Sequence, residues 1–128
     1  QRSRQPTARA SRRLLRSWIG GGTGSAMILE MAVLQVKPGL AGDFLEAFRT
    51  AEPIIASASG HLSHELRHCV EDPNRFLLLV CWRTLEDHTQ GFRGSPGYQR
   101  WKALLHHFYD PFPEVLHYEL AAGGAIPA

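Results

Sequence analysis

The spacing of apolar residues changes several times along the chain, and each change predicts a different element. Aliphatic side chains fill residues 28–36 almost continuously up to a Pro-Gly turn signal at 37–39, which predicts a central strand covered on both faces. Residues 40–58 then carry apolar side chains every three or four positions. This spacing predicts an amphipathic helix that bends at Pro53 and ends at Gly60.

Alternation returns after the helix. Residues 61–70 predict a strand with His64 and His68 on the face of its leucines and His61 on the other face. A turn of four residues leads into the strongly apolar segment 75–82. The short connection predicts an antiparallel hairpin.

The last third of the folded region predicts a broken helix and one more strand. Helical spacing covers residues 84–108, interrupted at 91–96 by glycines and by Ser95-Pro96, which restarts the helix. Alternation at 115–120 predicts the final strand.

The resulting order is β-α-β-β-α-β, which is the ferredoxin-like arrangement of the α+β class. A four-stranded antiparallel sheet would carry both helices on one face and leave the other face open. An apolar open face of this size is unfavourable for a monomer. We therefore expect an isologous homodimer in which two sheets face each other and enclose a cavity, a dimeric α+β barrel.

Charge divides the chain of 128 residues into unlike parts. Residues 1–26 hold six arginines and no acid and then become Gly-rich, whereas 27–128 carry eight basic and twelve acidic residues. We expect 1–26 to be a disordered leader preceding a natural start at Met27, 27–120 to be one domain, and 121–128 to be a flexible tail. A basic tail that binds nucleic acid or anionic lipid is the alternative for the leader.

Composition also limits the partners and the compartment. The mildly acidic folded part argues against a nucleic-acid surface. No apolar run approaches the roughly 20 residues that span a bilayer, so we expect no membrane insertion. Cys69 and Cys81 lack a zinc-binding spacing, and free thiols are typical of a reducing compartment, which predicts a cytoplasmic protein.

Candidate chemistry is concentrated in the broken helix. His88, one turn into it, has the ordinary pKa of a general base and is the first catalytic candidate, with His64 the second. His64 and His68 lie about 13 Å apart along a strand, too far to share a metal. Candidates for substrate binding by stacking or hydrogen bonding are Trp82, Tyr98, Trp101, His107, Tyr109 and His68. Packing against the core is the alternative for each.

Five short motifs resemble the antibiotic biosynthesis monooxygenase domain family over residues 27–120. They are Lys37-Pro38-Gly39, Gly60, Glu71-Asp72-Pro73, Trp82-x-x-x-Glu86-x-His88 and Ser95-Pro96-x-Tyr98-x-x-Trp101. The resemblance implies a dimeric α+β barrel. Members of that family include cofactor-independent oxygenases of quinols and polyketide phenols, and haem-degrading enzymes.

The resemblance implies an enzyme that oxidises a small phenol or quinol with dioxygen and needs no cofactor. The positions that the haem-degrading branch uses fall near Ala32, Gly91-Phe92 and Trp101-Lys102, which do not match, so haem degradation is disfavoured. Haem or flavin binding stays open. The alternative function is a non-catalytic dimeric module that binds a small aromatic ligand or regulates a partner.

Overall fold

The computed structural model describes residues 27–124, so the predictions for 1–26 and 125–128 lie outside the described residues. Within them the chain forms four strands, two α-helices and two short helical turns. In chain order they are β1 (Ile28–Gln35), α2 (Ala41–Ala56), β2 (His61–His68), β3 (Arg75–Trp82), the π-helical turn η1 (Asp87–Phe92), α3 (Pro96–Leu105), the 3-10 turn η2 (His106–Phe108) and β4 (Val115–Tyr118).

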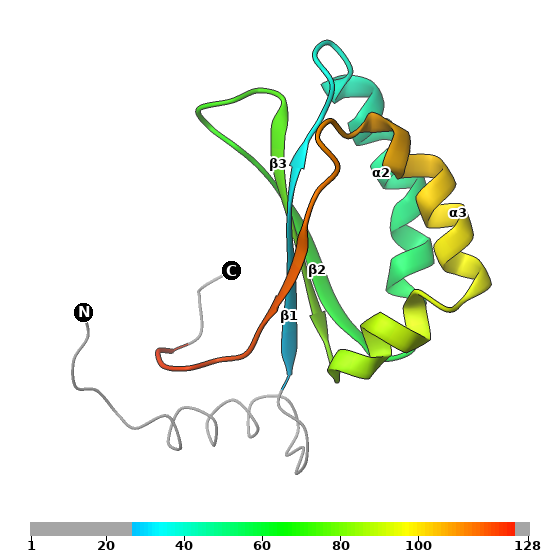
Figure 1. Cartoon of the computed structure of the whole chain (residues 1–128), viewed down its shortest axis with the longest axis vertical. Helices are drawn as coiled ribbons and strands as arrows, with labels where there is room; N and C mark the ends of the chain where they lie inside the picture. The colour runs from blue at the N-terminus through cyan, green and yellow to red at the C-terminus, as the bar shows by residue number, and fades with distance from the viewer. Residues whose placement is uncertain (1–26, 125–128) are drawn as a thin grey trace.

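The strands form one antiparallel sheet in the order β2-β3-β1-β4. Both α-helices cover the same face of this sheet, and the other face carries no helix (Figure 1). The α+β, ferredoxin-like prediction is confirmed. No helix among residues 27–124 is long and apolar enough to cross a bilayer.

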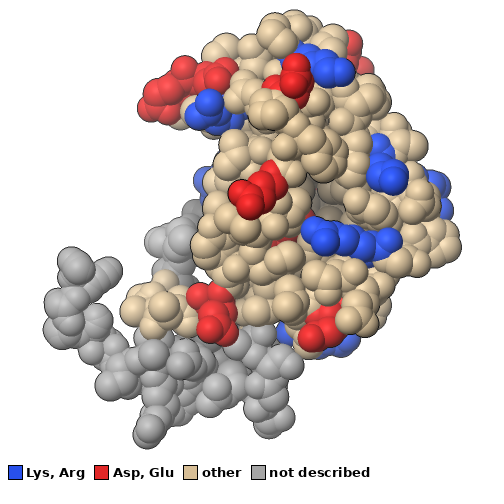
Figure 2. Space-filling view, viewed as in Figure 1, with Lys and Arg blue, Asp and Glu red and all other residues tan. Residues whose placement is uncertain are grey.

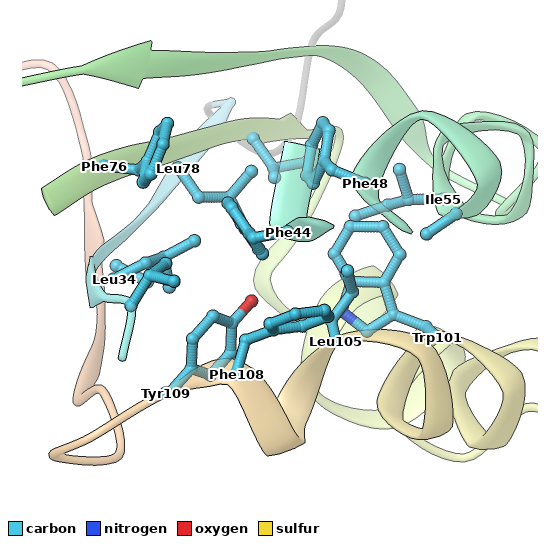
Figure 3. Packing of buried hydrophobic residues seen from close by; sticks show 14 of the residues in the cluster. Leu34, Phe44, Phe48, Ile55, Phe76, Leu78, Trp101, Leu105, Phe108 and Tyr109 are labelled. Carbon is cyan, nitrogen blue, oxygen red and sulfur yellow. The ribbon is translucent and has the colours of Figure 1, made fainter. Parts of the chain in front are cut away.

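The core lies between the sheet and the helices. The apolar stripe of α2 buries Phe44, Phe48, Ala51 and Ile55, as the spacing predicts. Figure 3 shows Phe44 among side chains from the sheet and from the end of the crossover, and its ring centroid lies 5.1 Å from that of Phe76. Each such buried ring contributes roughly 1.5–3 kcal/mol relative to leaving it exposed.

The crossover is broken, as predicted, but its first part is not an α-helix. The Arg93 amide donates to the His88 carbonyl at 3.1 Å, a bond that spans five residues and gives the wider π-helical turn. The Ser95 hydroxyl then accepts a hydrogen bond from the Tyr98 amide and caps α3. The α-helix ends at Leu105, and η2 continues to Phe108, where one helix was predicted.

The prediction for His61 was wrong. A bulge lies between His61 and Ser63, and one extra residue resets the alternation of β2. His61 therefore pairs with Trp82 and His64 with Val80, and both partners are buried on the helix face. His61 and His64 share that face and do not lie on opposite sides of the strand.

The face of the sheet that carries no helix is apolar at its centre. Val33, Leu116 and Tyr118 point to it and are 46%, 42% and 43% exposed. Leu77 and Leu79 of β3 lie between buried neighbours on the same strand and face the same way. The layer that was predicted to cover this second face of β1 is not formed by residues 27–124.

Gly60 makes the turn into β2 with a φ of +85°, and Gly39 makes the turn after β1 with a φ of +83°. Their surroundings differ. A Cβ at Gly60 would lie 2.6 Å from the Asp87 Cβ, whereas a Cβ at Gly39 would meet nothing within 4 Å.

We expect Gly60→Ala to destabilise the protein more than Gly39→Ala does. Both substitutions incur the left-handed backbone cost of about 1–2 kcal/mol, but only Gly60→Ala must also displace Asp87 and the start of η1. Urea unfolding of the two variants measures the difference. Equal losses would contradict the packing argument.

Candidate functional site

A cavity of about 330 Å³ lies between the helix face of the sheet and the crossover. Figure 2 shows the surface hollowed between these two parts of the molecule. The cavity has apolar walls that include Leu34, Ile55 and Trp101. Its polar lining residues are Glu30, His88, Arg93, Tyr98, His106 and Tyr109. Apolar walls with a few convergent polar groups are typical of a small-molecule site.

Glu30 and His88 form the buried polar end of this cavity. Their exposed fractions are 6% and 3%, and they are the buried polar or charged residues of the described chain. The Trp82 indole N–H donates to Glu30 Oε1 at 2.8 Å, and His88 Nε2 lies 3.4 Å from the same oxygen. The His88 ring stacks on Trp82 with centroids 5.2 Å apart. Glu30 Oε2 has no hydrogen bond to residues 27–124, and Glu30 lines the cavity.

The pair connects to the surface through His117 on β4. His117 pairs with Glu30 across β1 and β4, and its Nε2 lies 2.8 Å from His88 Nδ1. In one tautomer assignment, His117 Nε2–H donates to His88 Nδ1, and His88 Nε2 keeps its 3.4 Å contact with Glu30 Oε1. His117 is only half-buried, so this chain of contacts runs from the cavity to solvent.

Burial controls the protonation of these groups. Burial raises the pKa of Glu30, and the Trp82 hydrogen bond and the positive charge of Arg93 partly oppose the rise. Burial, with the charges of Arg93 and His117, lowers the pKa of His88 to about 3. Burial and Arg93 also lower the pKa of His117. At neutral pH these two histidines are therefore uncharged, while Arg93 favours the ionised form of Glu30 against the effect of burial.

Four of the predicted site residues line the cavity: His88, Tyr98, Trp101 and Tyr109. Tyr109 is buried, which raises its pKa, so its hydroxyl remains a hydrogen-bond donor at neutral pH. Trp82 lies one layer behind the cavity, where it holds Glu30 and His88 in place.

The other predicted residues lie elsewhere. His64 Nε2 contacts Glu52 Oε2 at 2.8 Å on α2, and its Nδ1 contacts His61 Nε2 at 2.8 Å, so it belongs to a separate cluster. His68 contacts the Pro73 carbonyl and stacks on Phe76. His107 is exposed. None of the three lines the cavity, and their proposed roles stay untested predictions.

Sequence reasoning missed Glu30, Arg93, His106 and His117. The available signal was Glu30, the one acid within the aliphatic run 28–36. An acid there must be either exposed on an edge or buried with a partner. No group of three or more metal-binding side chains is present in residues 27–124.

Comparison with known proteins identifies the family of the chain. The sequence model of the antibiotic biosynthesis monooxygenase family matches residues 27–104. Uncharacterized protein YczJ of Bacillus subtilis (strain 168) is 55% identical over 93 residues, which cover 73% of this chain and 98% of that protein. The chain belongs to the antibiotic biosynthesis monooxygenase family.

Solved structures of other proteins share the fold of this chain. A Bordetella bronchiseptica protein assigned to the same family superposes with a TM-score of 0.71 and 32% identity, over 75% of this chain and 98% of its own. SnoaB, a cofactor-independent oxygenase from Streptomyces nogalater, has a TM-score of 0.61 and 15% identity, over 81% of this chain and all of its own. At that identity, the SnoaB likeness is one of fold.

The buried histidine predicts a pH dependence of stability. The pKa of His88 is lowered to about 3 in the folded chain, whereas an unperturbed histidine has a pKa near 6.5. Between these two pH values the unfolded chain binds a proton at His88 and the folded chain does not. The stability that His88 contributes is present above pH 6.5 and is lost as the pH falls toward 3. Glu30, with its raised pKa, opposes this trend in part, because its contribution is lost as the pH rises.

We expect His88→Gln to flatten the slope of unfolding free energy against pH between about 6 and 4, by up to roughly 1.4 kcal/mol per pH unit. Chemical denaturation at several pH values measures this slope. His107→Gln, which removes a solvent-exposed ring, is the matched control. An unchanged slope in His88→Gln would show that His88 is protonated in the folded state.

Proposed function

We propose that the chain is a cofactor-independent monooxygenase that converts a small phenol or quinol into a quinone with dioxygen. The observation that carries the proposal is the buried Glu30–His88 pair at the end of an aromatic-lined cavity. Membership of the family and the fold shared with SnoaB support it. The substrate enters as the free phenol, and the protein supplies a base, hydrogen-bond donors and a dry site.

Glu30 is the better proton acceptor of the pair. An ordinary phenol has a pKa near 10, and His88 has a pKa of about 3, so transfer to His88 alone is uphill by roughly 9 kcal/mol. The raised pKa of Glu30 makes its carboxylate the stronger base, and its Oε2 is free. His88, whose Nε2 lies 3.4 Å from Glu30 Oε1, then positions Glu30.

The chemistry balances with dioxygen as the oxidant. Glu30 takes the phenol proton, and the phenolate passes electrons to dioxygen, which forms a C–O bond at a ring carbon that bears hydrogen. Glu30 returns its proton to the outer peroxide oxygen. Cleavage of the O–O bond, with loss of the ring hydrogen, releases water and leaves the quinone carbonyl. Tyr98 and Tyr109 are the donors for the substrate oxygen.

Oxygen uptake with a panel of phenols and reduced quinols tests the proposal. We expect one dioxygen consumed per substrate, a loss of at least 100-fold in kcat in Glu30→Gln, and a loss of 10²–10⁴-fold in His88→Ala. Gln90→Ala, an exposed position on the same turn η1, is the control.

Full turnover by His88→Ala would remove His88 from the mechanism. Binding of the phenols without any oxygen uptake would favour the ligand-binding module instead.

We further infer that two copies of the chain pair through the open face of the sheet. Apolar side chains from β1, β3 and β4 lie there, and no described element covers them. A face of this kind is stabilised when a second copy removes it from water. Pairing on that side leaves the cavity, which opens on the helix face, accessible in both copies.

We expect Val33→Lys to convert the dimer into a monomer in analytical ultracentrifugation, because it places a charge at the centre of the contact. Val70→Lys is the matched control, since Val70 is 93% exposed in the β2–β3 turn and away from this face. A dimer that survives Val33→Lys with unchanged affinity would place the interface elsewhere.

A further inference from the structure

The geometry points to a substrate class that the proposed function leaves open: an aromatic ring that carries a carboxylate, held by Arg93. The inference rests on the proposed function in one respect, since it takes the cavity to be the aromatic site. Arg93 would bind the carboxylate at the opening, while the ring hydroxyl meets Glu30 at the buried end. Among the described residues that line the cavity, no other lysine or arginine is available to bind a ligand carboxylate.

Arg93 is the one Lys or Arg among the described residues that line the cavity. Its side chain is solvent-exposed, and it forms no ion pair with residues 27–124. Arg67, Arg75 and Arg83 each lie within 4 Å of a carboxylate, and Arg49 and Arg100, which form no such pair with residues 27–124, do not line this cavity. A guanidinium at this position offers paired N–H donors that match a carboxylate.

The backbone of Arg93 is tied to the turn that carries His88. Its backbone amide donates to the His88 carbonyl at 3.1 Å, the π-helical bond that shapes η1. Its charge acts on Glu30, His88 and His117, so the guanidinium lies within electrostatic reach of the buried pair. A ligand group bound by Arg93 therefore lies in the same cavity as Glu30.

The cavity has room for such a ligand. Its volume of about 330 Å³ is roughly twice the 150 Å³ of an engineered cavity that binds benzene. One substituted ring fits, with aromatic contacts available from Phe92 and Trp101.

Calorimetric titration under nitrogen tests the inference without any turnover. The probes are 2,5-dihydroxybenzoate and its neutral isostere 2,5-dihydroxybenzamide. We expect the carboxylate to bind at least tenfold more tightly to the wild-type protein, and Arg93→Gln to abolish that preference. Arg93→Lys, which keeps the charge but loses the paired donors, should retain part of it. Arg49→Gln, an exposed position on α2, is the control and should keep the full preference.

The outcomes separate the two proposals. Equal binding of both probes to the wild-type protein, or a preference that survives Arg93→Gln, overturns the carboxylate inference and leaves the oxygenase proposal standing. An Arg93-dependent preference without oxygen uptake supports the ligand class and counts against the oxygenase. Binding of neither probe counts against the inference and against the cavity as an aromatic site.

Discussion

The site depends on one energetic constraint, the burial of a carboxylate on the central strand of a mostly apolar sheet. An isolated buried carboxylate is strongly unfavourable, so the structure supplies compensation from every side. Trp82 donates to Glu30 from β3, His88 approaches it from η1, and Arg93 acts through its charge. The broken crossover is therefore more than a connection between strands, since His88 lies in its π-helical turn and Arg93 directly follows that turn.

The same constraint explains why the histidines around Glu30 are uncharged. Desolvation that raises the pKa of a carboxyl lowers that of an imidazole. A carboxylate and two neutral imidazoles can then share protons without adding net charge to the interior. Such an arrangement gives a stronger base than an exposed carboxylate.

The fold was predictable because its signals are local: periodicity, turn residues and the Ser95-Pro96 helix start. Four cavity residues, His88 among them, were found because aromatic and titratable side chains are concentrated in the crossover. Glu30 was missed because its partners come from β3 and η1, more than fifty residues away in sequence. His61 was misplaced because a bulge leaves no clear signature in an alternating pattern. Local sequence patterns do not predict which distant residues contact a side chain, and they do not predict where a bulge shifts the register of a strand.

Strand β4 is only four residues long, and its alternation has a consequence for the whole molecule. His117 points toward the cavity, while Leu116 and Tyr118 on either side of it point to the open apolar face. A slip of this strand by one residue would exchange the two sets of side chains. It would withdraw the imidazole from His88 and push hydrophobic groups into its place. The register of one short edge strand therefore determines both which side chain contacts His88 and which side chains lie on the exposed apolar face.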